Sequence, residues 1–187
     1  MDEQTGILRY SAPAIALHWL IALLIVAGAG IGIHMADLPD TAPVRGGLFD
    51  LHRSLGVMVF ALVLARALWR AVRRPPALVS SMPRIQRLAA AATHIALYAL
   101  MITVPLTGYL LTNLDGESVK VFGWALPALA GPDAARATLL GDLHSFAAYT
   151  LIALAALHAL AAFRHHFMDR DETLARMVPG LRSRRLR

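Results

Sequence analysis

The sequence predicts an all-α membrane protein, with four transmembrane helices in a single up-down bundle and both termini in the cytoplasm. Hydrophobic residues make up 57% of the 187 residues, more than in an ordinary soluble domain. Four apolar segments each approach the length of about 20 residues that a helix needs to cross a bilayer. The segments span residues 14–34, 52–72, 90–112 and 143–165. Together they fill most of the single domain 1–187 and leave no room for a soluble nucleotide or flavin domain.

Residues that cap or break helices mark the limits of the first two segments. Segment 14–34 follows Ser11 and Pro13, which are typical of a helix cap and of a first helical turn. It ends before the turn-rich ADLPDTAP, and its N-terminal flank lacks the basic residues of a cleavable signal peptide. Segment 52–72 ends at WRAVRRPP, whose two prolines stop a helix.

The third and fourth segments are separated by the longest connection of the chain. Segment 90–112 contains Pro105 and Gly108, a pair that predicts a kink. The connection 113–142 contains VFGWALPAL, which we expect to lie at the membrane interface as a short cap over the outer end of the bundle. No internal repeat is evident in the sequence.

The distribution of arginine predicts the orientation in the membrane. The connection 66–89 holds six arginines and no acid, and the chain from Arg164 onward holds seven arginines against three acids. The connections 35–51 and 113–142 are net acidic instead. Positively charged connections stay in the cytoplasm, so both termini and the connection 66–89 are predicted to be cytoplasmic. Orientation and lipid headgroups explain the basic tail LRSRRLR, and nucleic-acid binding is not expected because no stacking aromatics accompany it.

Four of the eight histidines lie at matching depths in this bundle. His144 and His158 are fourteen residues apart on one apolar segment, so both imidazoles lie on one face of a helix, about 21 Å apart. His52 lies at the outer depth of His144, and His18 at the inner depth of His158. Imidazole is an axial ligand of haem iron, and polar groups inside a bilayer are usually functional. The bundle is therefore predicted to hold two b haems, the outer one on His52 and His144 and the inner one on His18 and His158. Helix packing is the alternative role of these histidines.

Any haem in this chain must be held non-covalently, because the sequence contains no cysteine. The same absence excludes disulfides, iron–sulfur clusters and thiolate-ligated haem. Small residues such as Gly28 and Gly56 leave room for a porphyrin, although they also serve close helix packing. Candidate partners for haem propionates are Arg53 at the outer side and Arg9 or Arg164 at the inner side; each is equally explained as a snorkelling residue.

The other histidines are assigned by face and depth. His34 lies sixteen residues after His18, about 160° around the helix, and is interpreted as an interfacial residue. His94 matches the inner depth, but one segment already supplies a ligand at each depth, so we place His94 beside the inner haem. His165 and His166 follow the last apolar turn, where an interfacial position is the default. Together with His94 they could form a polar pocket for a quinone headgroup.

These motifs resemble the bacterial cytochrome b561 family over nearly the whole chain. The last matching stretch, a histidine pair followed by D-x-T-L-x-R-M, is the most specific, and the connections match poorly. The matching pieces are ALHWL around His18, HRSLG from His52, HIALY from His94, PLTG from Pro105, LHSFAAY at His144, and ALHALAAFRHHF followed by RDETLARMVP.

The resemblance implies a four-helix diheme cytochrome b of the bacterial inner membrane, with axial ligands at His18, His52, His144 and His158. It also implies a superoxide oxidase, which takes an electron from superoxide at the outer face and passes it to ubiquinone. Positions matching His94 and His165 lie near the inner quinone site in that family. The superoxide access is expected to be locally positive, and Arg53, Arg45 and Lys120 could provide that charge although the outer connections are net acidic.

Two other functions remain open from the residues alone. The chain could be a membrane electron-transfer subunit that docks to a dehydrogenase or a hydrogenase and reacts only with quinone. It could also be a membrane protein without redox function, whose histidines serve zinc transport or structure. Co-purification of a partner complex would favour the first, and a colourless purified protein would favour the second.

Overall fold

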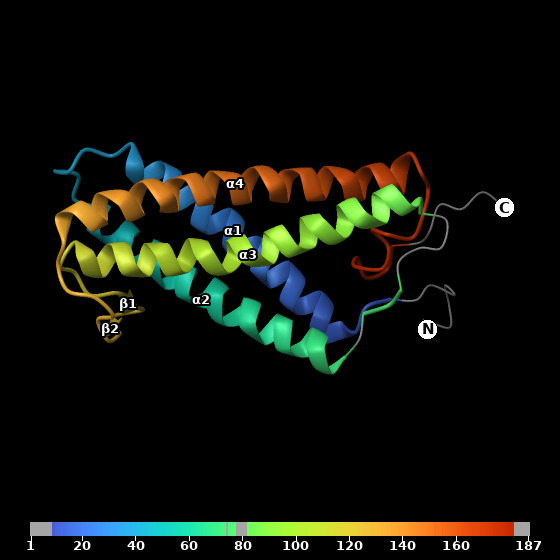
Figure 1. The fold of residues 1–187 in the computed structure, drawn as a ribbon, viewed down its shortest axis with the longest axis horizontal. Coiled ribbons are helices and arrows are strands. Elements are labelled where there is room, and N and C mark those ends of the chain that lie inside the picture. Colours follow the sequence, from blue (N-terminus) through green and yellow to red (C-terminus); the bar gives the residue numbers. More distant parts are fainter. Residues whose placement is uncertain (1–8, 74, 78–81, 182–187) are drawn as a thin grey trace.

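Four long helices and one short hairpin make up the computed structural model, which describes residues 9–73, 75–77 and 82–181. The helices are α1 (Ala12–Ala36), α2 (Arg45–Val72), α3 (Arg84–Leu114) and α4 (Ala134–Phe167). The strands β1 (Lys120–Val121) and β2 (Trp124–Ala125) pair antiparallel between α3 and α4. All four helices are long and apolar enough to cross a membrane. The predicted all-α four-helix membrane bundle is confirmed (Figure 1).

Each helix extends beyond the apolar segment that predicted it. The largest differences are at the starts of α2 and α4, which begin seven and nine residues before the predicted residues 52 and 143. The prediction followed the apolar residues, whereas a helix continues past the bilayer through polar ones. At the start of α4, for example, Asp133 Oδ1 accepts a hydrogen bond from Arg136 N over 3.1 Å. His52, His94 and His144, which lie near the starts of the predicted segments, therefore lie well inside α2, α3 and α4.

The predicted cap and kink residues also make contacts between helices. Ser11 is the N-cap residue of α1, but its side chain caps no backbone group there. Its hydroxyl instead accepts a hydrogen bond of 3.0 Å from Trp69 Nε1, which joins the start of α1 to the end of α2. Pro105 lies inside α3, and its side chain is the nearest neighbour of Gly56 on α2, 3.9 Å from an ideal Cβ position. These residues therefore set how α2 packs against α1 and α3.

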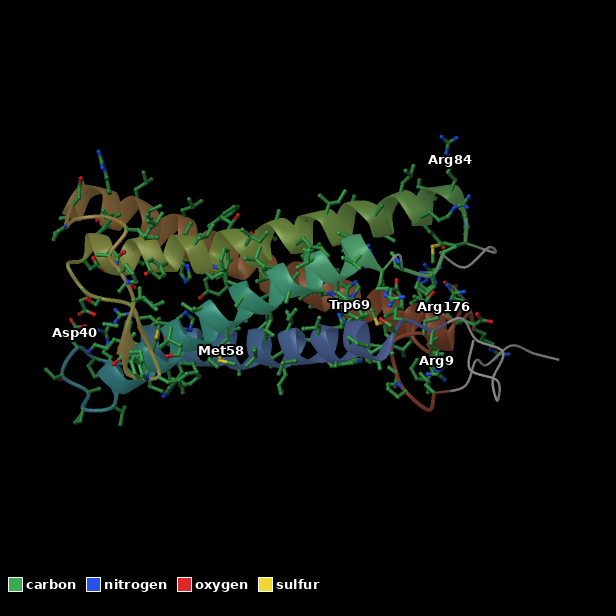
Figure 2. The ribbon with its side chains drawn as sticks, turned by 90° about the horizontal axis from the view of Figure 1, so that it is seen from below. Arg9, Asp40, Met58, Trp69, Arg84 and Arg176 are labelled. Carbon is green, nitrogen blue, oxygen red and sulfur yellow. The ribbon has the colours of Figure 1, made fainter. Side chains whose placement is uncertain are left out.

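One end of the bundle, here the arginine end, joins the two described ends of the chain. Arg9 donates hydrogen bonds to the carbonyl oxygens of Ala175, Val178 and Leu181, at 3.0, 2.7 and 2.8 Å. Figure 2 shows Arg9, Arg84 and Arg176 at this end and Asp40 at the opposite end. The chain thus crosses the bundle an even number of times. The predictions for the basic tail 182–187 and for the flank 1–8 fall outside the described residues.

The opposite end, here the hairpin end, carries β1 and β2. The Ser54 hydroxyl on α2 accepts a hydrogen bond from Phe122 N (3.1 Å) and lies 3.1 Å from Lys120 O. Tyr109 Oη on α3 donates to Pro127 O over 2.6 Å. The segment therefore lies against α2 and α3 where a cap was predicted. Trp124 at its tip is 82% exposed, which suits a position at a membrane interface.

A small apolar core lies between the two ends. It contains Ile21, Val59, Val63, Met101 and Leu151, with at least one residue from each helix. Leu151 is seven residues from both His144 and His158, so this core separates the two histidine levels of α4. Large apolar residues on the outside, such as Val26 at 71% and Leu68 at 67% exposure, give the lipid-facing surface of a multi-pass membrane protein.

Candidate haem sites in the helix bundle

Two histidines from α2 and α4 face each other near the hairpin end. The ring centroids of His52 and His144 are 6.1 Å apart, and the rings are nearly perpendicular at 83°. Two imidazoles that bind one metal ion from opposite sides, through bonds of about 2 Å, have centroids roughly 6 Å apart. This hairpin-end pair therefore has the spacing of two axial ligands of one iron.

Backbone carbonyls fix the orientation of both rings. His52 Nδ1 lies 3.0 Å from Gly28 O on α1, and His144 Nδ1 lies 3.0 Å from Val104 O on α3. A carbonyl can only accept a hydrogen bond, so each Nδ1 must carry the proton. Each Nε2 then keeps its lone pair, which is the usual arrangement of a metal-binding histidine whose other nitrogen is hydrogen-bonded.

A glycine lies beneath each of these rings. An ideal Cβ on Gly32 of α1 would be 3.0 Å from His52 Cε1, and one on Gly108 of α3 would be 3.0 Å from His144 Cε1. Both distances are tighter than ordinary van der Waals contact. The glycines therefore allow the imidazoles to pack directly against the neighbouring helix, which explains why the sequence places them there.

Replacing Gly108 with valine should displace His144 and weaken haem binding at the hairpin end. We expect an affinity loss of about 10–100-fold, as for other changes to groups that orient a metal ligand. The measurement is haem titration of the apoprotein, followed by optical spectroscopy. Gly30→Val is the matched control, because no atom lies within 4 Å of an ideal Cβ there. Equal affinity in both variants would show that Gly108 does not position the ring.

A cavity of about 400 Å³ adjoins the hairpin-end pair. Both histidines line it, and so do residues of all four helices. Its glycines leave space that side chains would otherwise fill, and an apolar cavity with few polar groups is typical of a cofactor site. The residues present thus fit a haem: two facing imidazoles in the ligand tautomer and a largely apolar cavity beside them. The glycines that line it are Gly28, Gly32, Gly56, Gly108 and Gly141.

Three histidines meet near the arginine end. The ring centroids of His18 on α1 and His158 on α4 are 6.2 Å apart, with an angle of 72° between the rings. His94 on α3 lies closer to His158, at 5.4 Å and 65°. His18 and His158, here the arginine-end pair, repeat the spacing of the hairpin-end pair, whereas His94 and His158 do not. His94 therefore lies beside this pair, and the assignment of His18 rather than His94 as the partner of His158 stays a prediction.

The arginines predicted to meet haem propionates have other partners. Arg53 Nη1 lies 2.8 Å from Glu117 Oε2 and 3.5 Å from Asp50 Oδ1. Arg9 is bonded to the carbonyls of the chain after α4. Arg164 is 54% exposed in its side chain and lies 3.5 Å from Asp169 Oδ1. Only Arg53 adjoins a histidine pair along its helix, so it is the remaining candidate of the three.

The structure separates the histidines that were predicted to share a quinone pocket. A second cavity, of about 440 Å³, is lined by His94 together with Tyr10, Arg70 and Tyr98. His165 does not line it; its Nδ1 lies 2.8 Å from Asp171 Oδ2 and 3.2 Å from Asp169 Oδ2. The second cavity is also lined by Pro75, Pro76, Ala90, Ala91 and Ile95.

The two remaining histidines differ in burial. His166 is only 3% exposed, and this contradicts the interfacial position that was its default. The helix is longer than predicted, so His166 still lies inside α4 and packs its ring on Phe167, with centroids 4.9 Å apart. His34 is exposed on α1, in agreement with its interpretation as an interfacial residue. Within the described ranges, no three or more His, Cys, Asp or Glu side chains group as a metal site.

Sequence reasoning missed Arg66. It was counted in the cytoplasmic connection 66–89, but it lies inside α2 and is only 8% exposed. Its Nη1 donates a hydrogen bond of 2.6 Å to Ala14 O on α1, one turn before His18. A signal was present in the sequence, since Arg66 follows His52 by fourteen residues, as His158 follows His144.

A sequence model of the prokaryotic cytochrome b561 family matches residues 9–180. The chain belongs to this family. It is 35% identical over 171 residues to cytochrome b561 homolog 2 of Escherichia coli K12, covering 91% of both chains. It is 30% identical over 177 residues to a Yersinia pestis protein named probable superoxide oxidase CybB, covering 93% of this chain and 98% of that one. Cytochrome b561 proteins carry b-type haem and transfer electrons in membranes, so the chain is a bacterial membrane electron-transfer protein.

Proposed function

We propose that this cytochrome b561 holds two b haems and transfers electrons from superoxide at the outer face of the bacterial inner membrane to ubiquinone at the inner face. The proposal rests on one observation: two histidines face each other toward each end of the bundle. Their ring centroids are 6.1 Å apart at the hairpin end and 6.2 Å apart at the arginine end. An arrangement of this kind is suited to moving electrons across the membrane, because it places one redox group near each face.

Each histidine pair has one role, which is to bind and orient a haem. His52 and His144 would hold one haem and His18 and His158 the other, through neutral imidazoles. The haems, when bound, supply the one-electron chemistry. The apolar core around Leu151 excludes water between the two levels, and the carbonyls of Gly28 and Val104 keep the hairpin-end rings in the ligand tautomer.

Superoxide is proposed as the donor because a relative is named a probable superoxide oxidase. At the hairpin end, Arg45 and Arg53 lie 4.9 and 5.4 Å from the centroid of the Phe49 ring, and both are also paired with carboxylates. Lys120 lies in the hairpin packed on α2. Two superoxide anions lose one electron each and leave as dioxygen. The two electrons and two protons convert one ubiquinone to ubiquinol.

The quinone is proposed to bind in the cavity beside His94. Its volume of about 440 Å³ is within the usual range for small-molecule sites. The Tyr98 hydroxyl, which lines this cavity, is buried and has no hydrogen-bond partner among the described residues. Such a group gains a partner when a ligand carbonyl binds. His94 is the proposed proton donor, because it lines this cavity.

An anaerobic optical titration of the purified protein tests the proposal. Superoxide should reduce the haem bands, and added ubiquinone should reoxidise them. Superoxide dismutase added beforehand is the control, and it should abolish the reduction. Haem bands that ignore superoxide but respond to a reduced quinone would refute the donor and favour the electron-transfer subunit of a dehydrogenase or hydrogenase. A protein without haem bands would refute the proposal as a whole.

A further inference from the structure

The two helix hairpins α1–α2 and α3–α4 place equivalent residues in equivalent contacts. In the first, His52 bonds Gly28 O and packs on Gly32; in the second, His144 bonds Val104 O and packs on Gly108. The bonded carbonyl precedes the glycine by four residues in both hairpins. The distances agree as well, at 3.0 Å for both hydrogen bonds and 3.0 Å for both Cβ–Cε1 approaches.

This equivalence extends to the arginine end. His18 precedes Gly28 by ten residues, and His94 precedes Val104 by ten residues. On the partner helices, Arg66 follows His52 by fourteen residues, and His158 follows His144 by fourteen. The hairpins are therefore related by a pseudo-repeat that the sequence alone did not reveal, because few residue identities are shared. In this repeat His18 corresponds to His94, and Arg66 stands where the second hairpin has His158.

Arg66 brings a positive charge to one histidine site. It is 8% exposed, and its Nη1 bonds the carbonyl of Ala14 on α1, one turn before His18. Among the described residues no carboxylate forms an ion pair with Arg66. Burying a cation without a carboxylate is costly, so an anionic or electron-rich group nearby is expected to offset it.

Among the described residues, no buried arginine or lysine lies at the hairpin end. Arg53 is the cation beside His52, and it is paired with both Glu117 and Asp50, which offset its charge. A haem at the arginine-end pair would therefore lie near an unpaired buried cation, and a haem at the hairpin-end pair would not. The second cation near the arginine end, Arg70, lies 5.6 Å from the Tyr98 ring centroid and lines the cavity beside His94.

We propose that Arg66 is a positioning residue that raises the midpoint potential of the haem at His18 and His158 above that of the haem at His52 and His144. This inference rests on the proposed occupancy of both pairs by haem. Arg66 forms and breaks no bond and takes up no proton or electron. With haems bound, its fixed charge would lower the free energy of the reduced state at the arginine end and would favour electron transfer toward the proposed quinone cavity.

Potentiometric optical titration of Arg66→Gln tests the inference. The protein should keep two haems per chain. The midpoint potential of the arginine-end haem should fall by at least about 59 mV, which for one electron is a tenfold change in the equilibrium constant of reduction. The arginine-end haem is identified as the one missing from His158→Ala. Arg66→Lys should restore most of the potential, since it keeps the charge. Arg73→Gln is the matched control, an exposed arginine at the end of the same helix.

Three results would overturn the inference. The first is an unchanged potential in Arg66→Gln with both haems bound. The second is an equal shift of both potentials, which would show a general effect on the fold. The third is loss of the arginine-end haem from both Arg66→Gln and Arg66→Met but not from Arg66→Lys, which would make Arg66 a binding residue only. A wild-type protein without two haems would instead refute the proposed function itself.

Discussion

Replacing His158 with alanine should remove one haem per chain and leave the other spectrally intact. His158 is the residue that faces His18 at ligand spacing, whereas the hairpin-end pair lies about 21 Å away along α4, beyond the apolar core. Loss of an axial imidazole should therefore act locally. The measurement is the ratio of haem to protein by pyridine haemochrome, with the spectrum of the remaining haem. We expect the ratio to fall from two to one.

The reciprocal variant and a neutral one complete this test. His144→Ala should remove the other haem and keep the arginine-end haem. His34→Ala should keep both, because His34 is an exposed histidine of α1 outside either pair. Two haems in His158→Ala would mean that His158 is not a ligand. Loss of both haems from that variant would mean that the two sites do not fold independently.

Replacing His94 with alanine should keep both haems but slow reoxidation of the reduced protein by ubiquinone. His94 lines the proposed quinone cavity and lies 5.4 Å from His158, closer than the ligand spacing. A positioned proton donor contributes about 10²–10⁴-fold to rate. We expect a decrease within that range in the rate constant, measured by stopped-flow mixing of the reduced protein with a soluble ubiquinone analogue.

Thr93→Val is the matched control for this effect. Thr93 is the preceding residue of α3 and does not line the cavity, so its reoxidation rate should match the wild type. A wild-type reoxidation rate in His94→Ala would show that His94 takes no part in the reaction with quinone. Loss of a haem from His94→Ala would show instead that His94 is a ligand, and the pairing of His18 with His158 would be wrong.

The bundle and both histidine pairs could be predicted from the sequence because each depends on a regular spacing. A run of about 20 apolar residues specifies a membrane helix, and fourteen residues bring His144 and His158 to one face. The starts of α2 and α4 could not be predicted in this way, because the helices continue into polar residues. Hydropathy reports the bilayer and not the end of the hydrogen-bonded helix.

The details around the histidines depended on contacts between helices. Gly32 packs against the His52 ring and Gly108 against the His144 ring. Both contacts join different helices, so they are visible only in the folded structure. Arg66 was grouped with the surface arginines because its type and position suit the positive-inside rule, although it is buried and bonded to α1. His165 likewise contacts the carboxylate of Asp171, six residues further along the chain, and does not line the cavity beside His94.

The electron paramagnetic resonance spectrum of the oxidised, purified protein tests the two-haem arrangement most directly. Axial imidazoles that are nearly perpendicular leave two of the iron d orbitals close in energy, so the low-spin ferric signal becomes strongly anisotropic. The ring angles of 83° at His52 and His144 and 72° at His18 and His158 predict two such signals of equal intensity. A single low-spin signal, or a high-spin signal from an iron with one imidazole, would contradict the account.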